Sequence, residues 1–249
     1  MRRIELFLSC VLVWVPVGCD GAPPTMDAGR AASDGGLASS VGATTIEDAP
    51  GAGRRPFGDP ERATNGVRGA GTGAGSLDVY SIEYGSYLVL SWGGGLVRNG
   101  PGVDFAVFEN PFALPDGTVF MDQVVVELSL DGAAWVPFPY DYTAPDEHQY
   151  SAEPDHWPGF AGVHPVTLNA DDFDVDPFDA ELAGGDGFDL DALPQDGEAG
   201  RIRERGFAFV RLSPARDHVN PDTGEPFPRD PSANGPDIDG VIARVVELP

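Results

Sequence analysis

The sequence predicts an all-β protein built as an antiparallel β-sandwich or jelly roll. Short runs of β-branched and aromatic residues recur along the chain, separated by Gly, Pro and Asp. No window shows a convincing helical period, and 24 prolines with 33 glycines would interrupt most helices. Strands of this length and spacing are typical of sandwich folds.

The N-terminal residues form a secretory signal. Two arginines precede an apolar stretch, residues 6–17, that is too short to span a membrane. Gly18 and Cys19 follow the stretch, and this Gly-Cys ending resembles bacterial lipoprotein signals, in which the cysteine is lipidated and becomes the new N-terminus. The resemblance implies a signal peptide over 1–18, a membrane anchor through lipid on Cys19, and a location in the bacterial cell envelope, at the surface or on the periplasmic side. The alternative is an ordinary secretory signal that is cleaved nearby.

After Cys19 the sequence predicts a tether followed by one domain. Residues 19–58 consist mainly of small and polar residues, which cannot bury enough surface to offset their ordering entropy, so we expect a disordered tether. Residues 59–249 are predicted to form a single β-sandwich domain. The chain has only Cys10 and Cys19, so a mature domain without disulfides must rest on its core, on bound ions, or on both.

The charge of the chain restricts its partners. The formal net charge is −25, and all 15 basic residues are arginine. Between Arg98 and Arg201 there is no Arg or Lys at all. Such a chain repels nucleic acid and anionic lipid headgroups and attracts divalent cations, although a solvated acidic surface accounts for most of the carboxylates.

Six segments carry the clearest strand patterns. Residues 123–130 alternate, with Val124, Val126 and Leu128 on one face and polar residues on the other. The Asp131-Gly132 pair that follows predicts a hairpin turn. The predicted strands are residues 87–92, 104–109, 123–130, 134–138, 206–212 and 238–248.

Two parts of the sequence resemble known families. The hairpin over residues 126–135 looks like the strand–Asp-Gly–strand–Trp hairpin of galactose-binding-like and discoidin-type β-sandwiches, which implies a galactose-binding-like fold. Residues 99–111 read NGPGVDFAVFENP, and the pattern NGPGxDFxVFENP resembles a family of exported bacterial cell-surface proteins and lipoproteins.

Later segments fit the same cell-surface family in the same order, at 159–165, 183–191 and 237–241, so the resemblance spans roughly residues 76–247. It implies fold and location rather than an activity. The chain departs from the family after the strand near residue 212, where a Pro-rich insert, 214–236, replaces a short polar turn. A fainter likeness is to surface lipoproteins that capture corrinoids.

Acidic residues in these motifs predict a calcium site. Calcium takes six to eight oxygen ligands, often from carboxylates and loop carbonyls of several segments. The predicted ligands are the carboxylates that flank the central strand and the Gly-rich turns: Asp104, Glu109, Asp189, Asp191 and Asp239. The alternative is that these side chains cap turns by accepting hydrogen bonds from backbone amides.

Aromatic residues gather between residues 135 and 160, among acids and prolines. Exposed aromatic rings stack on sugars, and neighbouring carboxylates accept hydrogen bonds from the sugar hydroxyls. Trp135 is predicted to lie in the core, which leaves Tyr150 and Trp157 as the predicted residues for binding a glycan or another surface component. The alternative is that these rings, too, are core or cover a long loop.

No pattern in the sequence predicts a catalytic residue. The four histidines lack zinc-binding spacing, and there is no Gly-x-Ser-x-Gly elbow. We therefore predict a non-enzymatic cell-surface lipoprotein, a binding or structural module stabilised by calcium. The alternatives are a carbohydrate-binding module, or an extracellular glycoside hydrolase that uses a pair of acids in the aromatic-rich loops.

Overall fold

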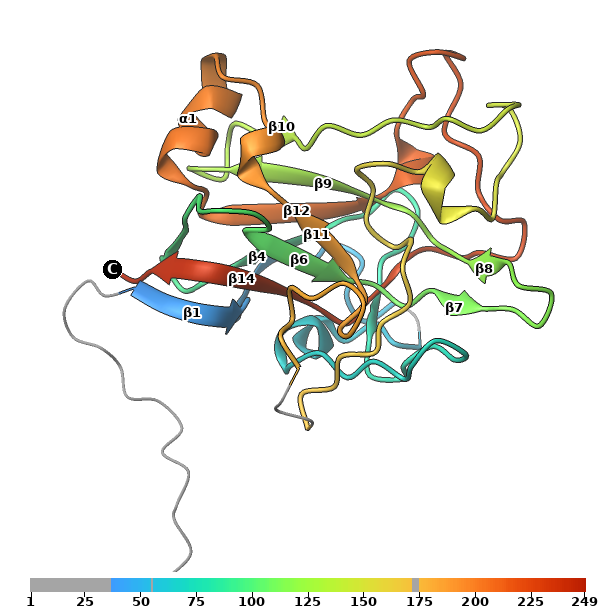
Figure 1. The fold of residues 1–249 in the computed structure, drawn as a ribbon, viewed down its shortest axis with the longest axis horizontal. Coiled ribbons are helices and arrows are strands. Elements are labelled where there is room, and N and C mark those ends of the chain that lie inside the picture. Colours follow the sequence, from blue (N-terminus) through green and yellow to red (C-terminus); the bar gives the residue numbers. More distant parts are fainter. Residues whose placement is uncertain (1–36, 55, 172–174) are drawn as a thin grey trace, which may run out of the picture. The chain divides into compact units, whose positions relative to one another are not determined.

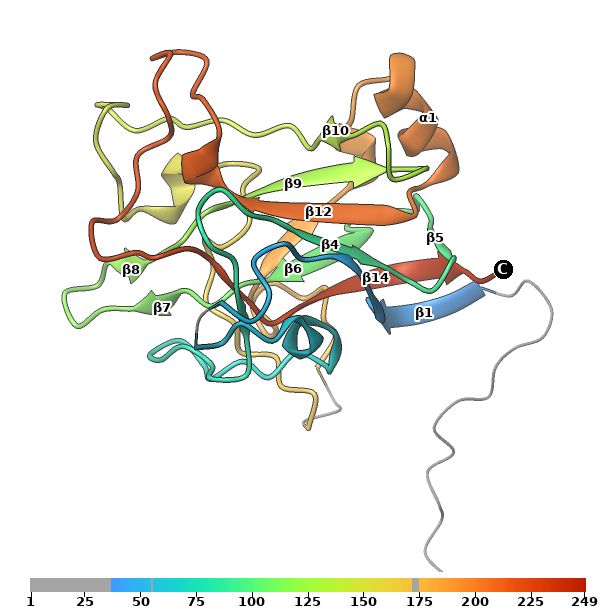
Figure 2. The same cartoon turned by 180° about the vertical axis from the view of Figure 1, so that it is seen from behind.

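Two five-stranded antiparallel sheets pack face to face (Figure 1 and Figure 2). The computed structural model describes residues 37–54, 56–171 and 175–249. The antiparallel β-sandwich that the sequence predicts is confirmed. Cys19 and the predicted signal lie outside the described residues.

The first sheet has the strand order β1-β14-β6-β11, and β5 pairs with the far end of β14. Its strands are β1 (Leu37–Gly42), β14 (Gly240–Glu247), β6 (Phe105–Phe108), β11 (Asp186–Phe188) and β5 (Leu96–Val97). The predicted strand at 104–109 is central, as expected from its apolar residues on both faces, because all four residues of β6 are buried.

The second sheet has the order β10-β9-β12-β4-β2. Its strands are β10 (Val136–Pro137), β9 (Val124–Ser129), β12 (Phe209–Pro214), β4 (Leu88–Ser91) and β2 (Thr45–Asp48). The turn at Asp131-Gly132 joins β9 to β10, so the predicted hairpin is confirmed. Gly132 takes φ 74° there, a conformation that glycine adopts at little cost.

Two short pairings and several single turns complete the fold. The short strands are β3 (Tyr80–Ser81), which pairs with β13 (Asp237–Ile238), and β7 (Phe112–Ala113), which pairs with β8 (Val119–Phe120). The 3₁₀ turns are η1 (Pro60–Thr64), η2 (Pro154–His156), η3 (Leu190–Ala192) and η4 (Ala215–Asp217).

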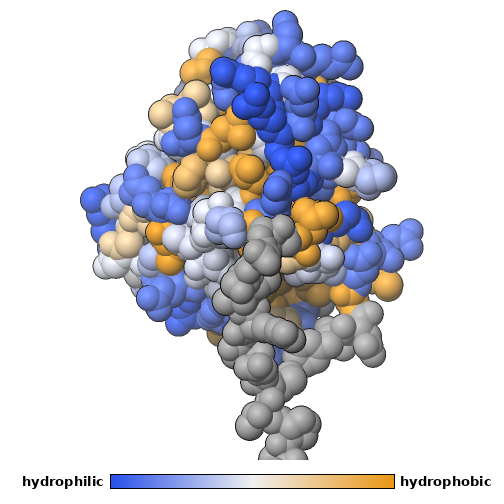
Figure 3. Space-filling view, turned by 90° about the vertical axis from the view of Figure 1, so that its left-hand side faces the viewer, coloured by the Kyte–Doolittle hydropathy of each residue, from blue (hydrophilic) through white to orange (hydrophobic). Residues whose placement is uncertain are grey.

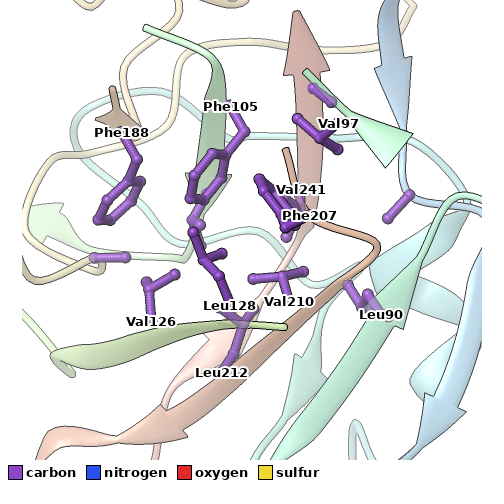
Figure 4. Close-up of a cluster of buried hydrophobic side chains, with 14 of the residues drawn as sticks. Leu90, Val97, Phe105, Val126, Leu128, Phe188, Phe207, Val210, Leu212 and Val241 are labelled. Atoms are coloured by element: carbon purple, nitrogen blue, oxygen red, sulfur yellow. The ribbon is translucent and has the colours of Figure 1, made fainter. Parts of the chain in front are cut away.

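The core lies between the two sheets, where side chains from both point toward one another (Figure 4). Phe105 of β6 stacks on Phe188 of β11 with ring centroids 5.0 Å apart. The second sheet contributes the inward side chains of β9, β12 and β4. The alternation seen in the sequence therefore has its expected cause, since Val126 and Leu128 face the core and Glu127 faces outward, with an intermediate exposure.

The predicted boundary between tether and domain is wrong for residues 37–48. These residues form β1 and β2, which pair with β14 and β4. Most of β1 is exposed, and its contribution comes from the backbone ladder with β14 rather than from buried side chains. The small polar residues of this segment hid it from a prediction based on hydrophobic pattern.

One α-helix, α1 (Gly197–Arg205), was not expected from the sequence. Ile202 is its only buried residue, so the segment has no apolar stripe that a periodicity search detects. The helix ends at Gly206, where φ is 91° and an added Cβ would lie 1.9 Å from the carbonyl oxygen of Val97. Figure 3 views the molecule from the side that carries α1, where hydrophilic surface surrounds small hydrophobic areas.

Candidate functional site

Three of the five predicted calcium ligands lie around one turn and bond to protein donors. Asp104 is buried, and its carboxylate accepts the amide N–H groups of Gly100 at 2.7 Å and Leu190 at 2.8 Å. Asp189 caps η3 by accepting the N–H of Asp191 at 2.8 Å, and Asp191 pairs with an arginine of α1 at 2.9 Å. Burial raises the pKa of Asp104 to about 6, although the two amide hydrogen bonds oppose the rise.

The other two predicted ligands lie beyond the opposite end of β6. Asp239 accepts the backbone N–H of Arg68 on both oxygens, at 2.9 and 3.0 Å. Glu109 is buried and accepts the N–H of Asp237 at 2.8 Å, while its Oε2 has no hydrogen-bond partner among the described residues. Burial, reinforced by the charge of Asp122, raises the pKa of Glu109 well above its usual range.

The five carboxylates are therefore not brought together as one calcium site. Within the described ranges, no group of three or more His, Cys, Asp or Glu side chains is arranged to hold a metal ion. Amide donors face the oxygens of Asp104 and Asp239, where a cation would need free lone pairs. Calcium binding stays a prediction, and the geometry fits the alternative, turn capping, better.

The two aromatic residues predicted to bind sugar belong to a hydrophobic cluster. Trp157 is 1% exposed, its ring centroid lies 3.9 Å from that of Tyr142, and its indole N–H donates to the carbonyl of Ser151 at 2.9 Å. Tyr150 is half-buried at the edge, 6.1 Å from Trp157. Trp157 cannot stack on a sugar from this position, so the structure corrects that prediction in favour of the core alternative.

This cluster, which we call the aromatic loop cluster, covers one end of the outer face of the second sheet. Val125 of β9 points outward and is buried beneath it. Phe227, from the Pro-rich insert, packs edge-on to Phe160 with centroids 5.2 Å apart. The insert therefore helps to cover the sheet. The other buried members of the cluster are Met121, Tyr142, Ala144, Trp157, Val163 and Ala215.

The uncovered end of the same face carries a pocket of about 350 Å³, which we call the sheet pocket. Its lining residues come from β2, from β4 and the residue before it, from β12, and from the β9–β10 turn: Glu47, Asp48, Tyr87, Val89, Asp131, Gly132, Trp135, Phe209 and Arg211. Strand register explains the convergence. Asp48 pairs with Val89, Val89 with Arg211, and Arg211 with Glu127, so one row crosses β2, β4, β12 and β9.

Arg211 lies near the centre of this row and is fixed from three directions. Its Nε and Nη2 donate to the two carboxylate oxygens of Glu127 at 2.6 and 2.7 Å. The guanidinium carbon lies 4.4 Å from the ring centroid of Trp135 and 5.9 Å from that of Tyr87. A bidentate pair combined with ring stacking holds a guanidinium in one orientation. Arg211 is therefore a preformed, planar element of the pocket.

Three further carboxylates line the sheet pocket, and each is anchored through one oxygen. Asp48 accepts the hydroxyl of Tyr87 at 2.7 Å, and Glu47 accepts that of Ser91 at 2.5 Å. Asp131 accepts the N–H groups of residues 133 and 134 at 2.9 and 3.0 Å, all on Oδ1. These hydrogen bonds lower the pKa of Asp131, so it stays ionised.

The aromatic residues of the sheet pocket are not the ones that the sequence analysis singled out. Trp135, which we expected in the core, is only half-buried and presents its ring to the sheet pocket. The sequence signal for this site was the pair of charged residues Glu127 and Arg211, each at an outward position of a strand that is mostly buried. Tyr87 and Asp48 carried no such signal, because only strand order brings them beside Arg211.

A larger pocket on the other sheet offers less chemistry. A pocket of about 570 Å³ lies along β1 and β14, lined mainly by apolar residues such as Val41, Val67 and Ile242. None of its described lining residues is charged, so it supplies no acid, base or ion pair. In the sheet pocket, by contrast, three aromatic rings, three carboxylates and a fixed arginine meet.

The chain matches no family model, no curated protein and no solved structure. The cell-surface and galactose-binding-like resemblances therefore stay predictions. In the part of the chain that the structure describes, the helices are all too short or too polar to cross a membrane.

Proposed function

We propose that this protein is a non-enzymatic carbohydrate-binding module, held in the bacterial cell envelope by lipid on Cys19. The observation that carries the proposal is the sheet pocket itself. Its aromatic walls lie beside oriented polar groups in a hollow of about 350 Å³, a combination that suits a sugar. The envelope location rests on the signal sequence.

The chemistry of a sugar ring fits the walls of this pocket. One face of a pyranose is a row of C–H groups, which packs against an aromatic ring, and its edge carries hydroxyls that need acceptors. Trp135 and Phe209 supply half-exposed aromatic surface. The anchored carboxylates of Asp48 and Asp131 supply acceptors that need no reorganisation on binding.

The proposal is tested by screening the purified chain against a panel of soluble neutral and charged oligosaccharides, with calorimetry on any that bind. Trp135→Ala should weaken binding at least tenfold, corresponding to about 1.4 kcal/mol, because the variant removes a pocket wall and the support of Arg211. Phe112→Ala is the matched control, since it truncates a half-buried aromatic that stacks on Phe120 in the β7–β8 hairpin, outside the pocket.

Two results would contradict the proposal. One is no binding to any sugar in the panel by a chain that unfolds cooperatively. The other is binding that Trp135→Ala and Phe112→Ala weaken equally, since that outcome would locate the sugar elsewhere or reflect a general loss of stability.

A further inference from the structure

The charges of the sheet pocket do not balance. Its lining contains three acids, Glu47, Asp48 and Asp131, and a single base, Arg211. The guanidinium is already neutralised by its bidentate pair with Glu127, which is itself largely buried. None of the three lining acids forms an ion pair with a described residue, so the pocket carries three uncompensated negative charges.

In each of these three carboxylates, one oxygen accepts hydrogen bonds from the protein and the other does not. Tyr87 donates to Oδ2 of Asp48, and Ser91 donates to Oε1 of Glu47. The two amide donors to Asp131 both reach Oδ1. The second oxygen of each carboxylate accepts no hydrogen bond from the described residues, and all three side chains are exposed, which leaves three acceptors available to a ligand or to water.

Aromatic rings add to the attraction for a cation. The face of an aromatic ring carries partial negative charge and attracts an ammonium group within about 6 Å. Arg211 already lies over Trp135 and Tyr87, but no described cation lies over Phe209, which also lines the pocket. An ammonium group in the pocket would therefore contact the carboxylates and also the ring of Phe209, which has no other described cation over it.

We propose that the sheet pocket selects carbohydrates that carry a protonated amine, such as oligomers of glucosamine. The inference rests on the proposed function, because it names the class of sugar bound at the same site. A neutral sugar leaves the three carboxylates hydrogen-bonded but uncompensated. A protonated amine both donates hydrogen bonds and balances charge, so the charged sugar binds more tightly.

The test compares two ligands that differ in this group alone. Calorimetry measures binding of glucosamine oligomers and of N-acetylglucosamine oligomers of the same length, at a pH where the free amines are protonated. At low salt we expect the charged oligomer to bind at least tenfold more tightly. The preference should shrink in 1 M salt, where the Debye length falls to about 3 Å.

Matched variants separate the pocket from the general charge of the chain. Asp48→Asn and Glu47→Gln should each reduce the preference for the amine severalfold, because each variant removes one negative charge from the pocket and so weakens binding of the charged oligomer more than binding of the N-acetylated one. Asp116→Asn removes an exposed carboxylate in the β7–β8 hairpin, outside the pocket, and should leave the preference intact. Equal loss in all three variants would mean that the net charge of −25, and not the pocket, attracts the amine, and would overturn the inference.

The remaining outcomes distinguish the two proposals. Equal affinity for the two oligomers, or tighter binding of the N-acetylated one, overturns the amine inference and leaves carbohydrate binding standing. The same holds if the chain binds other sugars of the panel and neither of these oligomers. Failure to bind any sugar overturns both.

Discussion

Buried carboxyl groups should make this protein more stable in mild acid than at neutral pH. Asp239 is 1% exposed and lies beyond the end of β6, next to β14. Burial raises the pKa of Asp239 from 3.8 to about 7, and the charge of Asp78 contributes to the rise, although the N–H of Arg68 opposes it. The folded chain therefore retains this proton at pH values where the unfolded chain has released it.

The sign and the magnitude follow from that difference. The contribution of Asp239 to stability is fully present below about pH 4 and is lost as the pH rises through about 7. Each pH unit in between costs about 1.4 kcal/mol for one proton, and the whole change amounts to at most about 4 kcal/mol. Burial also raises the pKa of Asp122 to about 7, so this second group steepens the slope in the same window.

Urea denaturation between pH 5 and pH 8 measures the slope directly. Asp239→Asn retains an oxygen for the N–H of Arg68 and has no proton to lose. Its stability curve should therefore be flatter than that of the wild type by about 1.4 kcal/mol per pH unit below pH 7. Asp116→Asn is the control, because hydrogen bonds from Thr118 lower the pKa of this exposed group out of the window. Parallel curves for Asp239→Asn and the wild type would refute the reasoning.

Three further predictions concern what holds the fold together. The melting temperature should be the same in EDTA and in millimolar calcium, because the carboxylates of the acidic turns accept hydrogen bonds from backbone amides. A bound ion would stabilise the folded chain by about 2.7 kcal/mol at one hundred times its Kd, so a rise in melting temperature that is specific to calcium would contradict this prediction. Phe105→Ala should cost about 3–5 kcal/mol in urea unfolding, since it removes the ring that stacks on Phe188, and a loss below 1 kcal/mol would contradict that packing. Gly206→Ala should destabilise the protein far more than Gly53→Ala. Both glycines have positive φ, but only at Gly206 would an added Cβ collide with a backbone oxygen. Similar unfolding midpoints for the two variants would show that this collision does not determine the loss of stability.

The strands were predictable where side chains carry the signal. β9 alternates buried and outward residues, and the Asp-Gly pair after it specifies the turn, so pattern and structure agree. β1 gave no such signal, because it is held mainly by backbone hydrogen bonds to β14. A composition of small polar residues is compatible both with a tether and with an exposed edge strand, and only the partner strand decides between them.

The site was less predictable than the fold. The density of aromatic residues along the chain predicted Trp157 as a sugar-binding residue. In the structure these rings, which are close in sequence, pack on one another and form the aromatic loop cluster. The rings of the sheet pocket come from separate strands and from the β9–β10 hairpin. Their convergence depends on the order β10-β9-β12-β4-β2, in which β12 lies between strands that are distant from it in sequence. A pattern search along the chain has no access to that order.

Arg211 forms different contacts from most of the other arginines in this lysine-free chain. Loops rich in Gly and Pro leave many backbone carbonyls without a ladder partner, and a guanidinium with five donors can satisfy them. Seven described arginines donate a side-chain hydrogen bond to a main-chain carbonyl: Arg62, Arg68, Arg98, Arg203, Arg216, Arg229 and Arg244. Arg211 instead bonds to a side-chain carboxylate on the neighbouring strand and stacks on Trp135, within a regular sheet whose carbonyls are already paired. Loop capping therefore does not account for Arg211, and its fixed position beside an open, acidic, aromatic hollow fits the proposed recognition of a ligand.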